Sequence, residues 1–328
     1  MRALITFFFI AILSVGASVF AWSQGINWFT QPGPLTQDEV FLVERGATLS
    51  GVAEKLEADG LITSAFWFTV FARVRDEATS LKAGEFLVPA AASPEEVLRI
   101  LTEGDNQLVV DITMPEGWTS WQFIQRLEAA ERFAGTVAEL PPEGSLLPET
   151  YRFNPNTPRS EVIARLQASM SETLAQLWAT RAADLPFSAP QEAVILASII
   201  ERETGVASER GLVASVMVNR LNIGMPLQMD STIEYGLTLG QGTLGRGLRR
   251  LEIDDADNPY NTYQHRGLPP GPIANPGRAA LEAVLNPPTS DYLYFVADGE
   301  GGHNFARTLQ EHNRNVAAWR ASQQSGND

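Results

Sequence analysis

The sequence predicts an α+β protein with an N-terminal transmembrane helix, a small α+β subdomain and a larger mixed α+β domain that contains a buried helix. An uncharged apolar stretch, Leu4–Trp22, predicts the first part. Short strand-like runs between helix patterns predict the second. In the larger domain, every residue of Ala193–Ile200 is apolar or small, and a helix that is apolar on all sides belongs in a core.

These patterns also give the expected boundaries. We expect a cytoplasmic tip at residues 1–3, a transmembrane helix at 4–22, a linker at 23–37, the small subdomain at 38–106, the larger domain at 107–322 and a loose tail at 323–328.

The N-terminal stretch decides the expected location. Leu4–Trp22 is long enough to cross a hydrocarbon core of about 30 Å at about 1.5 Å per residue. Arg2 precedes it and acidic residues dominate after it, so the positive-inside rule predicts a single-pass protein of the cytoplasmic (inner) membrane with an extracytoplasmic, periplasmic body. The alternative is a signal peptide cleaved after Ala21. Either interpretation exports the rest of the chain.

The small subdomain follows a strand–helix–helix–strand pattern. Ser93-Pro-Glu-Glu96 is a strong helix start, with a capping residue and a proline at the first helical position. The unit resembles a LysM-like fold, whose members commonly bind N-acetylated glycans. The alternative is a spacer that carries no ligand. The expected elements are strands at 40–43 and 85–88 and helices at 49–58, 65–74 and 94–102.

Composition excludes several functions. The net charge of −15 argues against nucleic-acid binding, which depends on Lys and Arg. With no cysteine, disulfides and thiolate catalysis are impossible. The three histidines lack the spacing of a zinc motif, so we expect no metal and no cofactor.

The apolar helix carries the chemistry that the sequence suggests. Ser188-Ala-Pro-Gln191 predicts its start, with Ser188 as the cap. Two acids, Glu201 and Glu203, stand at its C-terminal end. Glu201 follows a face of small residues, where a cleft forms more easily, while Glu203 follows a bulkier face.

A carboxyl group against apolar walls has a raised pKa and can act as a general acid. The alternative is a structural pair between a buried glutamate and an arginine, for which Arg202, Arg210 and Arg220 are available. The residues alone leave both interpretations open.

A set of motifs in a fixed order resembles the YceG-like family of endolytic murein transglycosylases, and the likeness covers nearly the whole chain. One departure is Ser231, where many relatives have proline; we expect Asp230 to cap a helix over residues 231–235. The motifs are Ala197-Ser-Ile-Ile-Glu-Arg-Glu-Thr204, Val206-Ala-Ser-Glu-Arg210, Val216-Met-Val-Asn-Arg-Leu221, Met225-Pro-Leu-Gln-Met-Asp230, Pro259-Tyr-Asn-Thr-Tyr263, Gly267-Leu-Pro-Pro-Gly-Pro-Ile-Ala-Asn-Pro276, Tyr294-Phe-Val-Ala-Asp-Gly299 and Gly301-Gly-His303.

The resemblance implies cleavage of the β-1,4 bond between N-acetylmuramic acid and N-acetylglucosamine inside nascent peptidoglycan strands, which would end their polymerisation. Glu201 would be the single catalytic acid and base, and the product would carry a 1,6-anhydro sugar. The partners implied are glycan strands and penicillin-binding protein synthases. The alternatives are a non-catalytic peptidoglycan-binding scaffold and a hydrolytic muramidase.

The polar residues after the apolar helix are candidate glycan contacts, with loop architecture as the alternative for each. Glu203 and Glu209 are expected to support the site by orienting arginines or loops, and His303 to lie in a turn near the cleft. The candidate contacts are Gln228, Asp230, Ser231, Tyr260, Asn261 and Tyr263.

Overall fold

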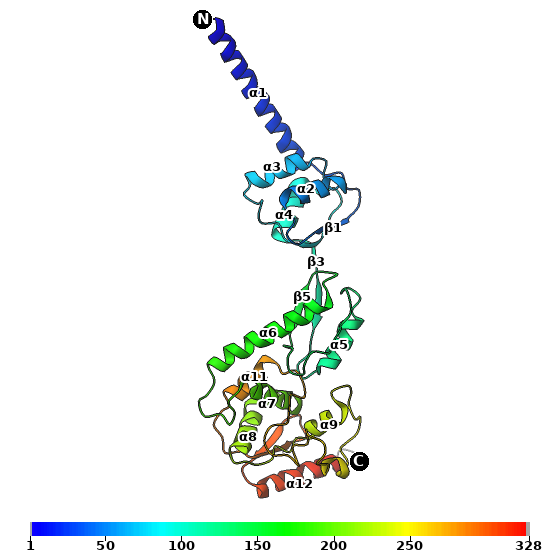
Figure 1. Cartoon of the computed structure of the whole chain (residues 1–328), viewed down its shortest axis with the longest axis vertical. Coiled ribbons are helices and arrows are strands. Elements are labelled where there is room, and N and C mark those ends of the chain that lie inside the picture. The colour runs from blue at the N-terminus through cyan, green and yellow to red at the C-terminus, as the bar shows by residue number, and fades with distance from the viewer. Residues whose placement is uncertain (1, 326–328) are drawn as a thin grey trace. The chain divides into compact units, whose positions relative to one another are not determined.

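The computed structural model describes residues 2–325, and the chain divides into two compact units (Figure 1). The N-terminal unit comprises Met1–Val110 with Arg152–Pro155. The C-terminal unit comprises Asp111–Tyr151 with Asn156–Asp328. Helices and short strands occur in both, so the predicted α+β class is confirmed.

The N-terminal unit is a three-stranded antiparallel sheet packed against short helices, in the order β1-β2-β3. Phe41 pairs with Phe86 across β1 and β2, and both side chains are buried in the core of the unit. Thr48, Ser64 and Ser93 cap α2, α3 and α4 by accepting a backbone N–H bond, as capping residues do. The elements are α1 (Arg2–Thr30), β1 (Glu39–Val43), α2 (Leu49–Ala58), α3 (Ala65–Val74), β2 (Gly84–Val88), α4 (Pro94–Glu103) and β3 (Gln107–Leu108).

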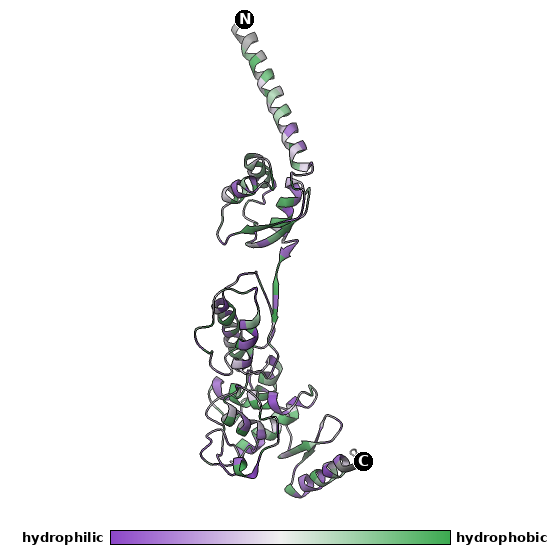
Figure 2. Ribbon diagram, turned by 90° about the vertical axis from the view of Figure 1, so that its right-hand side faces the viewer, coloured by the Kyte–Doolittle hydropathy of each residue, from purple (hydrophilic) through white to green (hydrophobic). Residues whose placement is uncertain are grey.

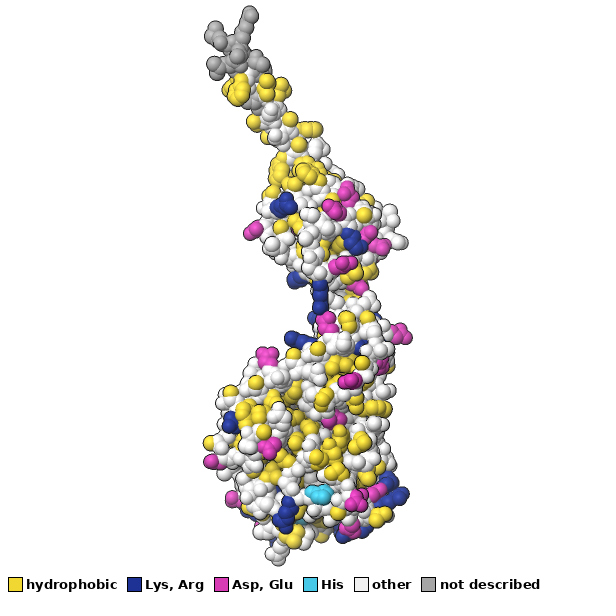
Figure 3. Space-filling view, viewed as in Figure 1, with side chains coloured by type: hydrophobic (Ala, Val, Ile, Leu, Met, Phe, Trp, Pro, Cys, Tyr) yellow, Lys and Arg dark blue, Asp and Glu magenta, His cyan; other side chains and the backbone are white. Residues whose placement is uncertain are grey.

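The first helix is longer than expected. α1 contains the predicted membrane segment and continues to Thr30, so much of the predicted linker at 23–37 is helical. Its C-terminal end packs on the unit, where the ring of Phe29 stacks on that of Phe71 at 4.5 Å. Hydrophobic side chains lie exposed along α1 (Figure 3). Within residues 2–325, however, no helix combines the length and apolarity that a membrane crossing requires, so the predicted transmembrane helix is not confirmed.

The C-terminal unit is mostly helical, with two small two-stranded sheets. One pairs β4 with β5, and the other is the antiparallel hairpin of β6 and β7, in which Phe295 faces Phe305. The elements are β4 (Val110–Thr113), α5 (Ser120–Ala129), β5 (Thr150–Phe153), α6 (Arg159–Ala179), α7 (Pro190–Glu203), α8 (Arg210–Asn222), α9 (Asp230–Thr238), α10 (Arg250–Ile253), α11 (Arg278–Leu285), β6 (Tyr294–Ala297), β7 (His303–Ala306) and α12 (Leu309–Ser325).

The apolar helix α7 is the centre of this unit, as its sequence predicts. Leu196, Ile199 and Ile200 are fully buried in one cluster with side chains of α8 and α11. The last helix, α12, is hydrophilic by comparison, as the purple residues of the helix beside the C-terminus show (Figure 2). Ser198, also fully buried, accepts a 3.0 Å hydrogen bond from the N–H of Ile273 and so attaches the Gly/Pro-rich loop to α7.

Three local predictions are wrong. α7 begins at Pro190 rather than after a Ser188 cap, because proline is well suited to the first helical position, and Glu192 accepts the N–H groups of residues 188 and 189. Asp230 is the first residue of α9 and does not cap it. α12 continues to Ser325, into the predicted tail, while residues 326–328 lie outside the described residues.

Candidate functional site

The two acids at the end of α7 lie in different surroundings. Glu201 is held by the backbone: its Oε2 accepts a 2.9 Å hydrogen bond from the N–H of Gly277. Its Oε1 lies 3.7 Å from Nη2 of Arg210, and its side chain is only 5% exposed. Burial raises the pKa of Glu201, and nearby Glu116 raises it further, while Gly277 and Arg210 act against this. Glu201 therefore resembles the structural pair of the alternative interpretation.

The small-residue face of α7 is covered rather than open. A Cβ at Gly117 would lie 3.5 Å from the Glu201 side chain, and the backbone of Ile273 reaches Ser198 on the same face. Small residues allow a neighbouring backbone to come close, and here two loops do so. The expectation that a cleft forms over this face was wrong.

Glu203 instead faces a cleft. Its Oε1 accepts a 2.6 Å hydrogen bond from the hydroxyl of Ser231. Burial raises the pKa of Glu203 above its usual value. The hydrogen bond from Ser231 lowers this pKa, the charge of Asp230 raises it, and His303 and Arg202 lower it. The carboxyl group thus retains its proton to higher pH than an exposed glutamate does.

The cleft beside Glu203 has a volume of about 580 Å³ and lies wholly within the C-terminal unit. Three of the candidate glycan contacts line it, together with residues of the β6–β7 hairpin and of α12. The lining residues are Glu203, Arg220, Gln228, Met229, Asp230, Tyr263, Tyr294, Phe295, Val296, Ala297, His303, Leu309, His312, Asn313 and Trp319.

Arg220 fixes two walls of this cleft. Its buried guanidinium donates to the carbonyl of Leu227 at 2.7 Å and to that of Leu293 at 2.6 Å, so it holds the loop before α9 against the start of β6. The guanidinium also lies over the ring of Tyr294, 5.2 Å from its centroid. Gln228, at the bend of the loop, has a left-handed φ of 53°, which is uncommon for a residue other than glycine and often marks a functional site.

Asp230 and Tyr263 lie together at the cleft. The hydroxyl of Tyr263 donates a 2.7 Å hydrogen bond to Oδ1 of Asp230. Burial, together with this bond to an acidic partner, raises the pKa of Tyr263, so the phenol remains protonated. The pair presents a carboxylate and an aromatic ring, the groups that sugars commonly meet in binding sites.

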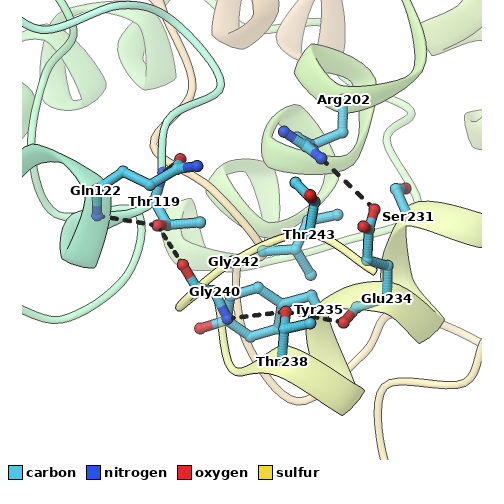
Figure 4. Close-up of a pocket in the computed structure, with 11 residues that line it drawn as sticks. Thr119, Gln122, Arg202, Ser231, Glu234, Tyr235, Thr238, Gly240, Gly242 and Thr243 are labelled. Carbon is cyan, nitrogen blue, oxygen red and sulfur yellow. Dashed lines mark hydrogen bonds and ion pairs between the residues drawn. The ribbon is translucent and has the colours of Figure 1, made fainter. Parts of the chain in front are cut away.

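Ser231 also borders a second, smaller pocket (Figure 4). Across this pocket, Arg202 reaches Glu234 at 3.7 Å, which draws the guanidinium toward α9. On the opposite side, Thr119 donates to the carbonyl of Gly240 at 2.7 Å. Ser231 therefore lies between the cleft and this pocket, with its hydroxyl on Glu203.

Two candidate contacts are packed within the unit instead. Asn261 is fully buried, and its Nδ2 donates to the carbonyls of Glu252, Ile253 and Asp255. Tyr260 packs against the core and lies 4.9 Å from the ring of Tyr235. Neither is among the residues that line the cleft beside Glu203. The bonds of Asn261 favour the loop-architecture alternative, while the role of Tyr260 as a glycan contact stays a prediction.

The supporting residues also fall in different places. Glu209 does orient a loop, but its partner is a histidine: Oε2 lies 2.7 Å from Nδ1 of His303. His303 lies in the hairpin as predicted, yet it also lines the cleft. Glu203, predicted as a support, lines the cleft itself.

Apart from His303, the cleft residues from the β6–β7 hairpin and from α12 were not predicted from the sequence. Tyr294 and His303 stood in motifs of the resemblance, which was the available signal. Trp319 and His312 stand in a hydrophilic helix with no motif, so only the fold could bring them to Glu203.

The arrangement is suited to acid–base chemistry on a neutral polymer. A half-buried carboxyl group with a raised pKa lies in a cleft with aromatic rings and polar side chains, which hold sugars through stacking and hydrogen bonds.

Comparisons with known proteins find named relatives that match most of this chain. The chain is 30% identical to the endolytic murein transglycosylase of Streptococcus pneumoniae (strain D39 / NCTC 7466) over 322 residues, covering 84% of this chain and 57% of the relative. It is 29% identical to the endolytic murein transglycosylase of Bacillus subtilis (strain 168) over 304 residues, covering 83% of this chain and 82% of the relative. The chain thus spans little more than half the length of the streptococcal protein.

A crystal structure of a yceG-like protein from Listeria monocytogenes is similar in fold. Its TM-score is 0.52 at 26% sequence identity, and the match covers 85% of this chain and 98% of that chain. The sequence of residues 41–318 matches the YceG-like family. This chain therefore belongs to the YceG-like family.

Proposed function

We propose that this protein is an endolytic lytic transglycosylase of peptidoglycan, and that Glu203 is its catalytic acid and base. The supporting observation is the cleft, which brings Glu203 together with Gln228, Asp230 and Tyr263. The relatives that bear this activity in their names match most of this chain.

Glu203 is a better candidate than Glu201 for geometric reasons. A general acid must reach the leaving oxygen of the substrate. Glu203 lines the cleft, whereas Glu201 is held between Gly277 and Arg210 under two loops. The sequence-based choice of Glu201 remains a prediction, and glutamine variants of Glu201 and Glu203 distinguish between the two acids.

The hydrogen bond from Ser231 suggests which oxygen carries the proton. Because the Ser231 hydroxyl donates to Oε1 of Glu203, that oxygen acts as the acceptor and the proton belongs on Oε2. Oε2 would protonate the glycosidic oxygen as the bond to the anomeric carbon breaks. The resulting carboxylate would then take the proton of the muramoyl 6-hydroxyl, whose oxygen attacks the anomeric carbon and closes the 1,6-anhydro ring. Intramolecular attack has a high effective molarity and requires no activated water.

Product mass tests the reaction. Purified glycan strands digested with the full-length protein should give fragments lighter by one water than hydrolysis products, with internal cuts from the earliest times. Fragments with a reducing end would contradict the transglycosylase assignment, and intact strands would favour a binding scaffold.

A muramidase is the second candidate, and Asp230 is the observation that favours it. Hydrolases pair two carboxylates, and Asp230 supplies a second one in the same cleft as Glu203. The structure gives Asp230 a hydrogen bond from Tyr263, and its charge raises the pKa of Glu203. If the protein is a transglycosylase, Asp230→Asn should still release the anhydro product. If it is a hydrolase that uses Asp230 as its base, Asp230→Asn should lose the release of fragments with a reducing end.

The N-terminal unit supports two further proposals. Its β1-α2-α3-β2 order, with antiparallel pairing of the strands, is consistent with a LysM-like module that binds N-acetylated glycan. The exposed apolar side chains of α1, Phe7 and Phe8 among them, are consistent with a membrane anchor. The first proposal is tested by asking whether the isolated module pulls down glycan strands. The second is tested by asking whether the full chain leaves membranes in a carbonate wash or only in detergent. Contacts with penicillin-binding protein synthases are also a proposal, which cross-linking in cells would test.

A further inference from the structure

The turn between β6 and β7 is built around one histidine. Oδ1 of Asp298 accepts the N–H groups of Glu300 at 2.7 Å and of Gly302 at 2.9 Å, which closes the turn. A Cβ at position 302 would lie 2.7 Å from Oε1 of Glu209 and 2.8 Å from Oδ2 of Asp298, so a side chain there would displace both carboxyl groups. The next residue is His303, the first of β7.

Glu209 holds both the backbone and the ring of His303. Its Oε1 accepts the backbone N–H of His303 at 3.0 Å, and its Oε2 lies 2.7 Å from Nδ1 of the ring. Since a carboxylate only accepts hydrogen bonds, Nδ1 carries the hydrogen. Phe295 packs against the ring edge-to-face, at 5.3 Å and 86°. The imidazole is therefore fixed in orientation, and Nε2 on its other edge is the polar atom left for the cleft.

His303 and Glu203 line the same cleft, although they come from β7 and α7. A positive charge on His303 lowers the pKa of Glu203, against the effects of burial and of Asp230. Arg202 also lowers this pKa, but its guanidinium lies 3.7 Å from Glu234 and so reaches toward α9. His303 is thus a basic group that the fold holds at the acid.

We propose that His303, held by Glu209, is a positioning residue of the reaction: its imidazole stabilises the carboxylate that Glu203 becomes after it has given its proton to the leaving oxygen. This inference rests on the proposed role of Glu203. It also explains why Glu209 holds both the backbone N–H and the ring of His303. The bonds to Asp298 are enough to close the turn, so the turn itself does not require Glu209.

The effect should appear in a pH profile. The charged or titratable groups that face Glu203 are Arg202 on its own helix, Asp230 on α9, Tyr263 in the loop that follows α10, and His303 on β7. Those that face His303 are Glu209 on α8, Asp298 in the turn and Glu203. Since His303 lowers the pKa of Glu203, His303→Gln should raise it. The alkaline limb of the rate profile, where Glu203 loses its proton, should then move to higher pH.

The experiment compares the full-length protein with three variants on purified glycan strands. His303→Gln should lower kcat about tenfold, change KM less than twofold and move the alkaline limb up by about half to one pH unit. Glu209→Gln should move the limb in the same direction by a smaller amount. The control is Glu300→Gln, an exposed residue of the same turn, which should leave the profile unchanged.

A second measurement does not depend on turnover. The ¹³C resonance of the Glu203 carboxyl, assigned by its loss in Glu203→Gln, can be titrated in the wild type and in each variant. The midpoint should rise in His303→Gln and Glu209→Gln. Equal midpoints in all proteins would overturn the inference, as would a loss of kcat without any movement of the alkaline limb. If Glu203→Gln retains activity, the proposed function has failed, and the carboxyl titration still shows whether His303 acts on Glu203. If His303→Gln does not fold, Glu209→Gln alone decides.

Discussion

Replacing Asn261 with alanine should destabilise the C-terminal unit rather than weaken sugar binding directly. Asn261 is fully buried. Its Nδ2 donates to the carbonyls of Glu252, Ile253 and Asp255 at 3.3, 3.0 and 2.7 Å, and its Oδ1 accepts the N–H of Tyr263 at 3.0 Å. The alanine variant loses all four bonds, so three backbone carbonyls and one backbone N–H lose their hydrogen-bond partner.

The size of the effect follows from these four bonds. A hydrogen bond contributes about 0.5–1.5 kcal/mol net, and a buried group left unpaired costs about 1–3 kcal/mol. Because the loop is partly exposed, water can reach some of these groups, so we expect a loss of about 2–4 kcal/mol in the free energy of unfolding. For a unit of this size that lowers Tm by roughly 4–16 °C.

Thermal unfolding of the full-length variant, followed by circular dichroism, measures this loss. The matched control is Asn313→Ala, since Asn313 is an exposed residue of the cleft wall and should leave Tm unchanged. If Asn261→Ala melted with the wild type while its KM for glycan rose, Asn261 would be a sugar contact and the structural interpretation would be refuted.

Two further variants test local features of the C-terminal unit. Ser231→Ala removes the 2.6 Å bond that lowers the pKa of Glu203. The alkaline limb should therefore move up by about one pH unit, and an unchanged limb would count against Glu203 as the titrating group. Gly236→Ala should lower the free energy of unfolding by about 1–3 kcal/mol, because its Cβ would lie 2.0 Å from Oδ1 of Asn258. The control is Gly242→Ala, whose Cβ would meet nothing within 4 Å, and equal melting of the two variants would contradict this packing.

Much of the fold could be predicted because local patterns determine it. The helices at 49–58 and 65–74 have the predicted bounds, since serine or threonine caps and apolar faces are local signals. The buried helix was also predictable, because every residue of Ala193–Ile200 is apolar or small. Helix starts were less certain: α7 begins at Pro190 without the expected Ser188 cap, and Asp230, the expected cap of α9, is instead its first residue.

The choice between the two acids could not be made from the sequence. A small-residue face on α7 fits an open cleft, but it fits a closely packed loop equally well, and the structure places Gly117 and Ile273 there. The cleft depends on a hairpin and on α12, which lie about a hundred residues later in the chain. Asn261 was similarly ambiguous, because a buried amide that builds a loop and an amide that binds sugar have the same sequence signature.

The most direct test of the central claim compares Glu203→Gln with Glu201→Gln on purified glycan strands, with released products weighed by mass spectrometry. Glu203→Gln should still bind strands but release no anhydro fragments, a loss of at least about a thousandfold in kcat. Glu201→Gln, once shown by its Tm to be folded, should retain measurable release of the same fragments. Full loss in folded Glu201→Gln together with persistent cleavage by Glu203→Gln would instead identify Glu201 as the catalytic acid.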